Sequence, residues 1–293
     1  MKCKKILTAL LAAACTMSGC HGDLDIMQDN KLSASNMWID ESDAETATYG
    51  IYLYMRDALK SVHDIYLCWG EFRNGLWGAG TNKTLSGVDQ TQVRTSTMSS
   101  SNAYADWSVM YKTVNQANLI LKHVPEMGIS ESVRNFSLGN AYFSRAWCYF
   151  WIARIWGDAP LALTGYESTA GDLYLPRAPK AEIFARIESD LTEAERYVTD
   201  NSDKAVATPA AVQMLKADYA LWMYRVAGGG SSYLTMAEEA IETLNLSASR
   251  LESDYAQVFS SANKLNKEVI FAVHQANGEA VNGPGYYLGW NSN

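Results

Sequence analysis

Apolar side chains recur at helical spacing over most of the chain. One stretch runs from Asp43 to about Lys60, and a second runs from about Ala103 to His123, with large residues three and four positions apart. A third stretch begins near Ser130 and is closed by Gly157. Its apolar residues surround most of the helix, which predicts that it is central and buried.

Three more helices are predicted after a Gly- and Pro-rich loop that extends from Gly157 to about Ala178. The fourth helix opens at Pro179, because proline is favoured in the first turn. The fifth opens with Thr208-Pro209, which is an N-cap residue followed by proline. Ser232 is expected to cap the sixth.

Two segments break this helical pattern. Ten of the residues between Thr81 and Ser101 are Ser or Thr, so residues 78–101 are predicted to form a surface loop. The short β-branched run from Val269 to Val273 predicts a strand.

The expected fold class is therefore mainly all-α. It consists of tetratricopeptide-like helical pairs with long irregular loops and a short C-terminal strand. Ala146-x3-Phe150-x2-Ala153 resembles the second helix of a tetratricopeptide repeat, although long helix pairs also build plain bundles.

The N-terminus indicates export. Lys2, Lys4 and Lys5 precede an apolar run from Ile6 to Ala14, which is far shorter than the roughly 20 residues of a membrane span. Residues 1–19 are therefore interpreted as a signal peptide. Met17-Ser18-Gly19-Cys20 resembles the bacterial lipobox; the alternative is an ordinary signal peptide with an incidental cysteine.

A lipobox implies that the Cys20 thiol carries a lipid and that residues 20–36 form a spacer above the membrane. Each buried methylene group contributes about 0.8 kcal/mol, so several acyl chains together make a lasting anchor. Residues 37–293 would then form the helical domain. Asp23 and Asp25 resemble the acidic surface-export signal of Bacteroidota lipoproteins.

Composition excludes several functions. The net charge of −8 argues against nucleic acid as a partner, because such binding depends on basic patches. The histidines are scattered, and no cysteine pair has metal-ligand spacing, so no metal or other cofactor is expected. Cys68 and Cys148 could pair, but they are expected to be two buried thiols, because a disulfide framework would need more cysteines. Arg145 and Arg154 are expected to pair with acids such as Asp158 or Asp190.

One short segment combines flat rings with planar polar groups, as sugar recognition requires. The candidate ligand-binding residues are Trp69, Glu71, Arg73, Asn74 and Trp77. Trp and Tyr offer a large apolar area and a polar handle. In the alternative interpretation the rings pack this segment onto the helices, and Arg73 pairs with Glu71. Tyr286, Tyr287 and Trp290 form a second aromatic candidate.

Segments in order from about residue 20 to residue 275 resemble the SusD/RagB family of nutrient-binding outer-membrane lipoproteins. The matching segments are Asp23-Leu24-Asp25, Asn36-Met37-Trp38, Asp43-Ala44-Glu45, Gly50-Ile51-Tyr52, Trp107-x3-Tyr111, Asn115-x-Ala117-Asn118, Ala141-Tyr142-Phe143-Ser144-Arg145-Ala146, Tyr149-Phe150, Gly157-Asp158-Ala159-Pro160-Leu161, Pro176-Arg177-Ala178, Asp190-Leu191 and Lys267-Glu268-Val269-Ile270-Phe271.

The resemblance implies a non-enzymatic protein, lipid-anchored at the cell surface in the outer membrane. It would capture oligosaccharide, or sometimes peptide, for a TonB-dependent transporter of the SusC type. Family members usually continue into a C-terminal half that contributes to ligand binding, so this chain is expected to be a truncated, N-terminal portion. The rival functions are a helical glycoside hydrolase, whose two carboxylates would lie about 5 to 9 Å apart, and a lipid-anchored protein-binding scaffold.

Overall fold

The computed structural model describes residues 37–74, 87–169, 173–246 and 250–275. The chain divides between Ile39 and Asp40, and the described residues from Asp40 onward form one compact unit. The signal peptide, Cys20, the spacer before residue 37, Trp77 and the aromatic candidates near residue 290 all lie outside the described residues.

The first helix of this unit, α2 (Glu41–Gly70), is ten residues longer at its C-terminal end than the sequence pattern predicted. Asp40 and Asp43 cap its start, since each carboxylate accepts a hydrogen bond from the backbone N–H of the other residue. The helix continues past Lys60 because Ile65 and Cys68 are both fully buried.

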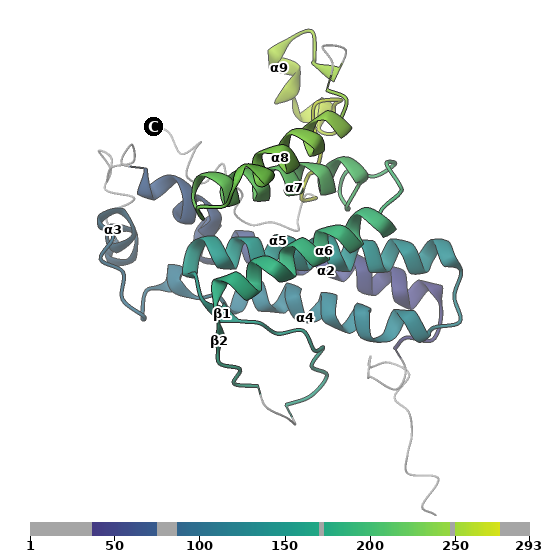
Figure 1. The fold of residues 1–293 in the computed structure, drawn as a ribbon, viewed down its shortest axis with the longest axis horizontal. Helices are drawn as coiled ribbons and strands as arrows, with labels where there is room; N and C mark the ends of the chain where they lie inside the picture. Colours follow the sequence, from purple (N-terminus) through teal and green to yellow (C-terminus); the bar gives the residue numbers. More distant parts are fainter. Residues whose placement is uncertain (1–36, 75–86, 170–172, 247–249, 276–293) are drawn as a thin grey trace, which may run out of the picture. The chain divides into compact units, whose positions relative to one another are not determined.

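The predicted central helix is confirmed as α5 (Glu131–Trp156). It packs against α2, α4 (Ser108–His123) and α6 (Lys180–Tyr197); Figure 1 shows the axes of α2, α4 and α5 lying roughly parallel, with α6 inclined to them. Buried residues occur on every turn of α5 between Ser137 and Ala153, which is why apolar positions surround it in the sequence.

The last long helices, α7 (Pro209–Arg225) and α8 (Ser231–Thr243), pack against each other as a pair. Thr208 caps α7 as predicted, because its side chain accepts a hydrogen bond from the N–H of Ala211. Pro179, which was predicted to open α6, is its N-cap, one residue before the helix start at Lys180. Ser232 was wrongly predicted to cap α8, because that helix begins at Ser231 and its N-cap is Gly230. The all-α, tetratricopeptide-like fold is therefore confirmed.

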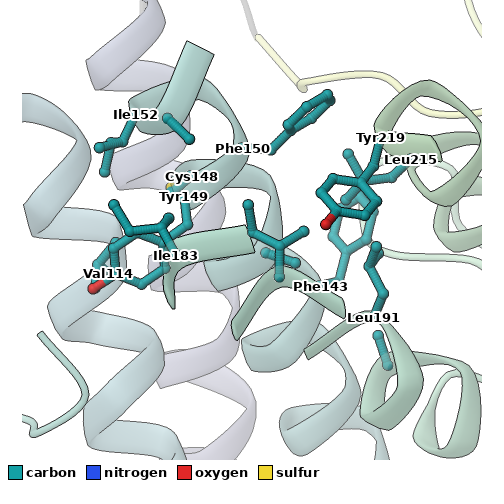
Figure 2. Packing of buried hydrophobic residues seen from close by; sticks show 14 of the residues in the cluster. Val114, Phe143, Cys148, Tyr149, Phe150, Ile152, Ile183, Leu191, Leu215 and Tyr219 are labelled. Atoms are coloured by element: carbon teal, nitrogen blue, oxygen red, sulfur yellow. The ribbon is translucent and has the colours of Figure 1, made fainter. Parts of the chain in front are cut away.

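Apolar side chains from several helices pack together in the core (Figure 2). Phe150 of α5 lies edge-on to Tyr219 of α7, with ring centroids 5.6 Å apart, and Ile183 and Leu191 of α6 belong to the same cluster. Cys68 and Cys148 are both buried, as expected. Burial raises the pKa of the Cys148 thiol far above its ordinary value.

The loop that follows α5 is tied to α4 by polar side chains at helical spacing. Tyr111 donates a hydrogen bond to the carbonyl of Pro160, and Asn118 donates to that of Ala162. Asn115 both donates to the carbonyl of Tyr166 and accepts from its N–H. Farther along α4, Lys122 and His123 contact the carboxylate of Glu167 at 2.5 and 2.6 Å.

The two ends of this loop pair as a short antiparallel sheet that the sequence did not predict. Strand β1 (Ala159–Pro160) lies beside β2 (Arg177–Ala178). Gly157, with φ of 72°, ends α5 just before β1 in a conformation that glycine adopts without strain. Within the described residues, no helix is both long and apolar enough to cross a membrane.

Two predictions of local structure were wrong. The described part of the 78–101 segment contains a helix, α3 (Val88–Thr95), whose Val93 is buried. The 269–273 segment is not a strand. The backbone N–H of Ala272 donates to the carbonyl of Lys204 and that of Val269 donates to the carbonyl of Asn266, while Ile270 and Phe271 pack against the core. Its apolar pattern therefore reflects side-chain burial without a partner strand.

Candidate functional site

Four tryptophan rings gather where α2, α5 and α7 approach one another. Trp69, near the end of α2, lies 5.8 Å from Trp151 and 5.3 Å from Trp156, between ring centroids, and both of these residues belong to α5. Trp222 projects from α7. All four rings are only partly buried, so a part of each is accessible to solvent.

These rings line a pocket of about 690 Å³. The lining residues are Cys68, Trp69, Gly70, Arg73, Val93, Met98, Ser99, Tyr104, Ala105, Trp151, Arg154, Ile155, Trp156 and Trp222. A concave, mostly apolar surface with a few polar groups is the usual form of a small-molecule site. The dimensions suit a few sugar rings.

Two of the indoles are fixed by hydrogen bonds to one short turn, η2 (Ala103–Ala105). Trp69 donates its N–H to the carbonyl of Tyr104 at 2.9 Å, and Trp156 donates to that of Ala105 at 3.1 Å. Asn102 caps the turn by accepting from the N–H of Tyr104 and also donates to α3. The wall of the pocket is therefore formed before any ligand arrives.

Arg154 is the polar group at the centre of the aromatic surface. Its guanidinium carbon lies 4.2 Å from the Phe150 ring centroid, 4.9 Å from that of Trp151 and 5.6 Å from that of Trp222. Partial burial lowers the pKa of this group, and nearby Asp218 counteracts part of that effect. The rings hold the guanidinium in place through cation–π contacts.

The short turn η1 (Glu71–Arg73) follows α2 and contains most of the remaining predicted ligand-binding residues. Arg73 lines the pocket together with Trp69. Glu71 and Asn74 are exposed, do not line it, and hydrogen-bond to each other at 2.8 Å. Phe72 is buried in a small cluster with Tyr104 and Val93, so it anchors the turn.

Residues 79–224 match the SusD-like family model, which is described as "Starch-binding associating with outer membrane". The chain belongs to the SusD-like family. It is 26% identical over 190 residues to the SusD-like protein P38 of Formosa agariphila, an alignment covering 65% of this chain and 36% of that protein.

Solved SusD-like structures share the fold. NanU of B. fragilis is 29% identical with a TM-score of 0.70, over 86% of this chain and 51% of NanU. A SusD superfamily protein from Bacteroides vulgatus is 25% identical with the same TM-score, over 85% and 52% of the two chains. This SusD-like chain thus spans about a third of the curated relative's length and about half that of the solved structures.

Of the residues that line this pocket in the SusD-like chain, sequence reasoning identified only Trp69 and Arg73 as ligand-binding candidates. The helical spacing of Trp151 and Trp222 is that of core residues, and Arg154 was expected to form an ion pair with an acid such as Asp158 or Asp190. Arg154 instead contacts Asp218, at 3.4 Å, while Arg145 does pair with Asp190. The available signal was the spacing of Trp147, Trp151 and Arg154 along one face of α5.

The site offers binding groups and no obvious catalytic ones. Within the described ranges, no three or more His, Cys, Asp or Glu side chains cluster so as to hold a metal ion. The pocket lining contains no Asp, Glu or His among the described residues. Its chemistry is that of ring stacking and hydrogen-bond donation.

Proposed function

We propose that the protein captures oligosaccharides at the pocket formed by Trp69, Trp151, Trp156 and Trp222, and that it does so without catalysis. The observation that carries this proposal is the set of partly exposed indoles around a hollow of about 690 Å³, two of which are fixed by hydrogen bonds. Rings in fixed positions stack on the C–H faces of sugars at a small entropic cost. The family description of starch binding supports the same class of ligand.

We also propose that the protein is a lipoprotein, anchored by Cys20 at the outer surface of the outer membrane, that delivers its ligand to a SusC-like TonB-dependent transporter. The lipobox-like Met17-Ser18-Gly19-Cys20 and the family's association with the outer membrane support this proposal. An oligosaccharide is favoured over a peptide because the pocket offers flat rings.

Affinity electrophoresis and calorimetry of the full chain, purified in mild detergent, test the capture proposal. A panel of plant and host polysaccharides is screened first, and the fragments of any that retard the protein are then titrated. The Trp222→Ala variant is expected to weaken binding roughly tenfold to a hundredfold, in keeping with the cost of losing a stacked ring. Cleavage of a panel member by the wild type would contradict a purely binding role.

A matched control separates the pocket from other exposed aromatics. Tyr255 of α9 (Tyr255–Val258) is 78% exposed and does not line the pocket. The Tyr255→Ala variant is expected to bind as the wild type does. An equal loss in both variants, or in neither, would argue against this pocket. Metabolic labelling with palmitate, compared between the wild type and Cys20→Ala, tests the anchor.

A further inference from the structure

The polar groups that remain available in the pocket are hydrogen-bond donors. Arg73 has no hydrogen bond or ion pair with another described residue, and the indole N–H groups of Trp151 and Trp222 likewise have no partner within the described ranges. Arg154 has five N–H donors and uses one of them, at 3.4 Å, toward Asp218. A complementary ligand must therefore supply acceptors.

Hydrogen-bond acceptors, in contrast, are scarce in the pocket, and several of those that line it already have partners. Among the described lining residues there is no Asp, Glu, Asn or Gln. The carbonyls of Tyr104 and Ala105 already accept from the two fixed indoles. The Ser99 hydroxyl is paired with that of Ser101 at 3.0 Å, and the Tyr104 hydroxyl accepts from Gln90 at 3.1 Å.

This imbalance does not suit a neutral sugar. Each hydroxyl group of a neutral sugar is both a donor and an acceptor, so a matching site provides both kinds of group. The pocket's bias also runs against the composition of the chain, which has 32 acidic and 24 basic residues. Two arginines line the pocket and, among the described lining residues, no carboxylate does.

The nearest acids are directed elsewhere. The Asp218 side chain is 56% exposed to solvent, whereas that of Arg154 is 22% exposed, so water screens much of their attraction. Glu71 accepts its hydrogen bond from Asn74. Neither acid lines the pocket. Neither accepts hydrogen bonds from the N–H donors that Arg73 and Arg154 still have available.

We propose that the ligand is an acidic oligosaccharide, whose carboxylate or sulfate groups face the guanidinium groups of Arg73 and Arg154 while its rings stack on the indoles. Guanidinium binds both oxyanions through paired, charge-assisted hydrogen bonds. This inference rests on the proposed capture of oligosaccharide and specifies its ligand class. The cation–π contacts fix Arg154 in advance, so little side-chain entropy is lost on binding.

The test compares each acidic glycan with its own neutral form. The full chain, in mild detergent, is titrated with fragments of homogalacturonan, alginate, glucuronoxylan and chondroitin sulfate, and with the same fragments after carboxyl reduction or desulfation. At least one acidic form is expected to bind about tenfold or more tightly than its neutral form, and raising the salt concentration is expected to reduce this difference. Comparing the effect of carboxyl reduction with the effect of desulfation identifies which anion is recognised.

Arginine variants locate the effect. Arg73→Gln lies at an exposed position and is expected to fold, and it should lower affinity for the acidic form about tenfold with little change for the neutral form. Arg73→Lys keeps the positive charge but loses the planar, two-pronged guanidinium group, so its affinity for the acidic form should be intermediate. Arg225→Gln, on an exposed arginine that does not line the pocket, is the matched control and should have no effect.

The outcomes separate the two proposals. Equal or tighter binding of the neutral forms would overturn the acidic-ligand inference and leave capture of oligosaccharides standing. Binding of acidic forms that Arg73→Gln does not weaken would also overturn it, because the anion would then be held elsewhere. Failure of every acidic and every neutral form to bind would overturn both proposals.

Discussion

Arg145 of α5 donates two parallel hydrogen bonds, at 2.8 and 2.7 Å, to the carboxylate of Asp190 in α6, and both side chains are almost wholly buried. The third nitrogen donates to the amide oxygen of Asn118 in α4 at 2.7 Å. One guanidinium group therefore joins three helices. Its charge is matched inside the protein, where an unmatched charge is costly.

Replacing Asp190 with Asn should strongly destabilise the fold. The change leaves the Arg145 charge buried without its counter-ion, which costs about 3–5 kcal/mol of unfolding free energy. Urea unfolding followed by circular dichroism measures this loss. Glu193→Gln is the control on the same helix. The Glu193 side chain is 33% exposed and lies 3.6 Å from that of Arg196, which is 69% exposed, so its loss should change stability by less than about 0.5 kcal/mol. Similar losses in both variants would contradict this account.

Gly139 marks a close approach between α5 and the end of α6. A Cβ atom there would lie 2.7 Å from the Val198 side chain and 3.0 Å from the Val198 backbone nitrogen. Gly139→Ala should therefore cost about 1–3 kcal/mol through overpacking. Gly128→Ala is the matched control, since nothing lies within 4 Å of its Cβ position. The melting temperature should fall for the first variant only.

Glu167 should make the loop after α5 sensitive to acid. Hydrogen bonds from Lys122, and then from His123, hold the pKa of its carboxyl below the usual value. A lowered folded-state pKa means that the contribution is fully present above the unfolded value, about 4.3, and is lost as the pH falls through the folded value. Hydrogen exchange of residues 161–169, corrected for intrinsic rates, should quicken below about pH 4 and not between pH 5 and 7. Glu167→Gln should remove this dependence; a dependence that persists in the variant would have another source.

The two buried cysteines should be unreactive in the folded protein. Residues 21–293 contain only Cys68 and Cys148, and both thiols are inaccessible to solvent. Burial also raises the pKa of Cys148, so it has almost no nucleophilic thiolate at neutral pH. An aromatic disulfide reagent should label neither cysteine at pH 8 and both in urea. Rapid labelling of Cys68 or Cys148 without urea would show that α2 or α5, respectively, opens readily.

The sequence predicted the helices that have strong local signals. The Thr208 cap fixed the start of α7, and the apolar circumference of α5 indicated its central position. Failures arose where tertiary contacts decide the outcome. Val93 is buried in a Ser- and Thr-rich segment, and Phe271 packs on the core without a strand partner, and neither position follows from local pattern.

The candidate site was only partly accessible to sequence reasoning for a related physical reason. Trp69 and Arg73 were identified because rings and polar groups are adjacent in that segment. Trp151 and Trp222 have the same helical spacing as core residues, and only the packing of α7 against α5 shows that these rings are left partly uncovered. Periodicity reports which side of a helix is apolar and does not report whether a neighbour covers it.

Helix α5 is buried by helices that precede it in the chain and by helices that follow it, and this has a consequence for biogenesis. The ribosome synthesises α2 and α4 before α5, but α6 and α7 follow it. A nascent chain that stops short of Arg225 therefore leaves part of the apolar surface of α5 exposed to solvent. The native fold therefore cannot be completed until more than two hundred residues have been synthesised. Until then the polypeptide is prone to aggregation and depends on chaperones.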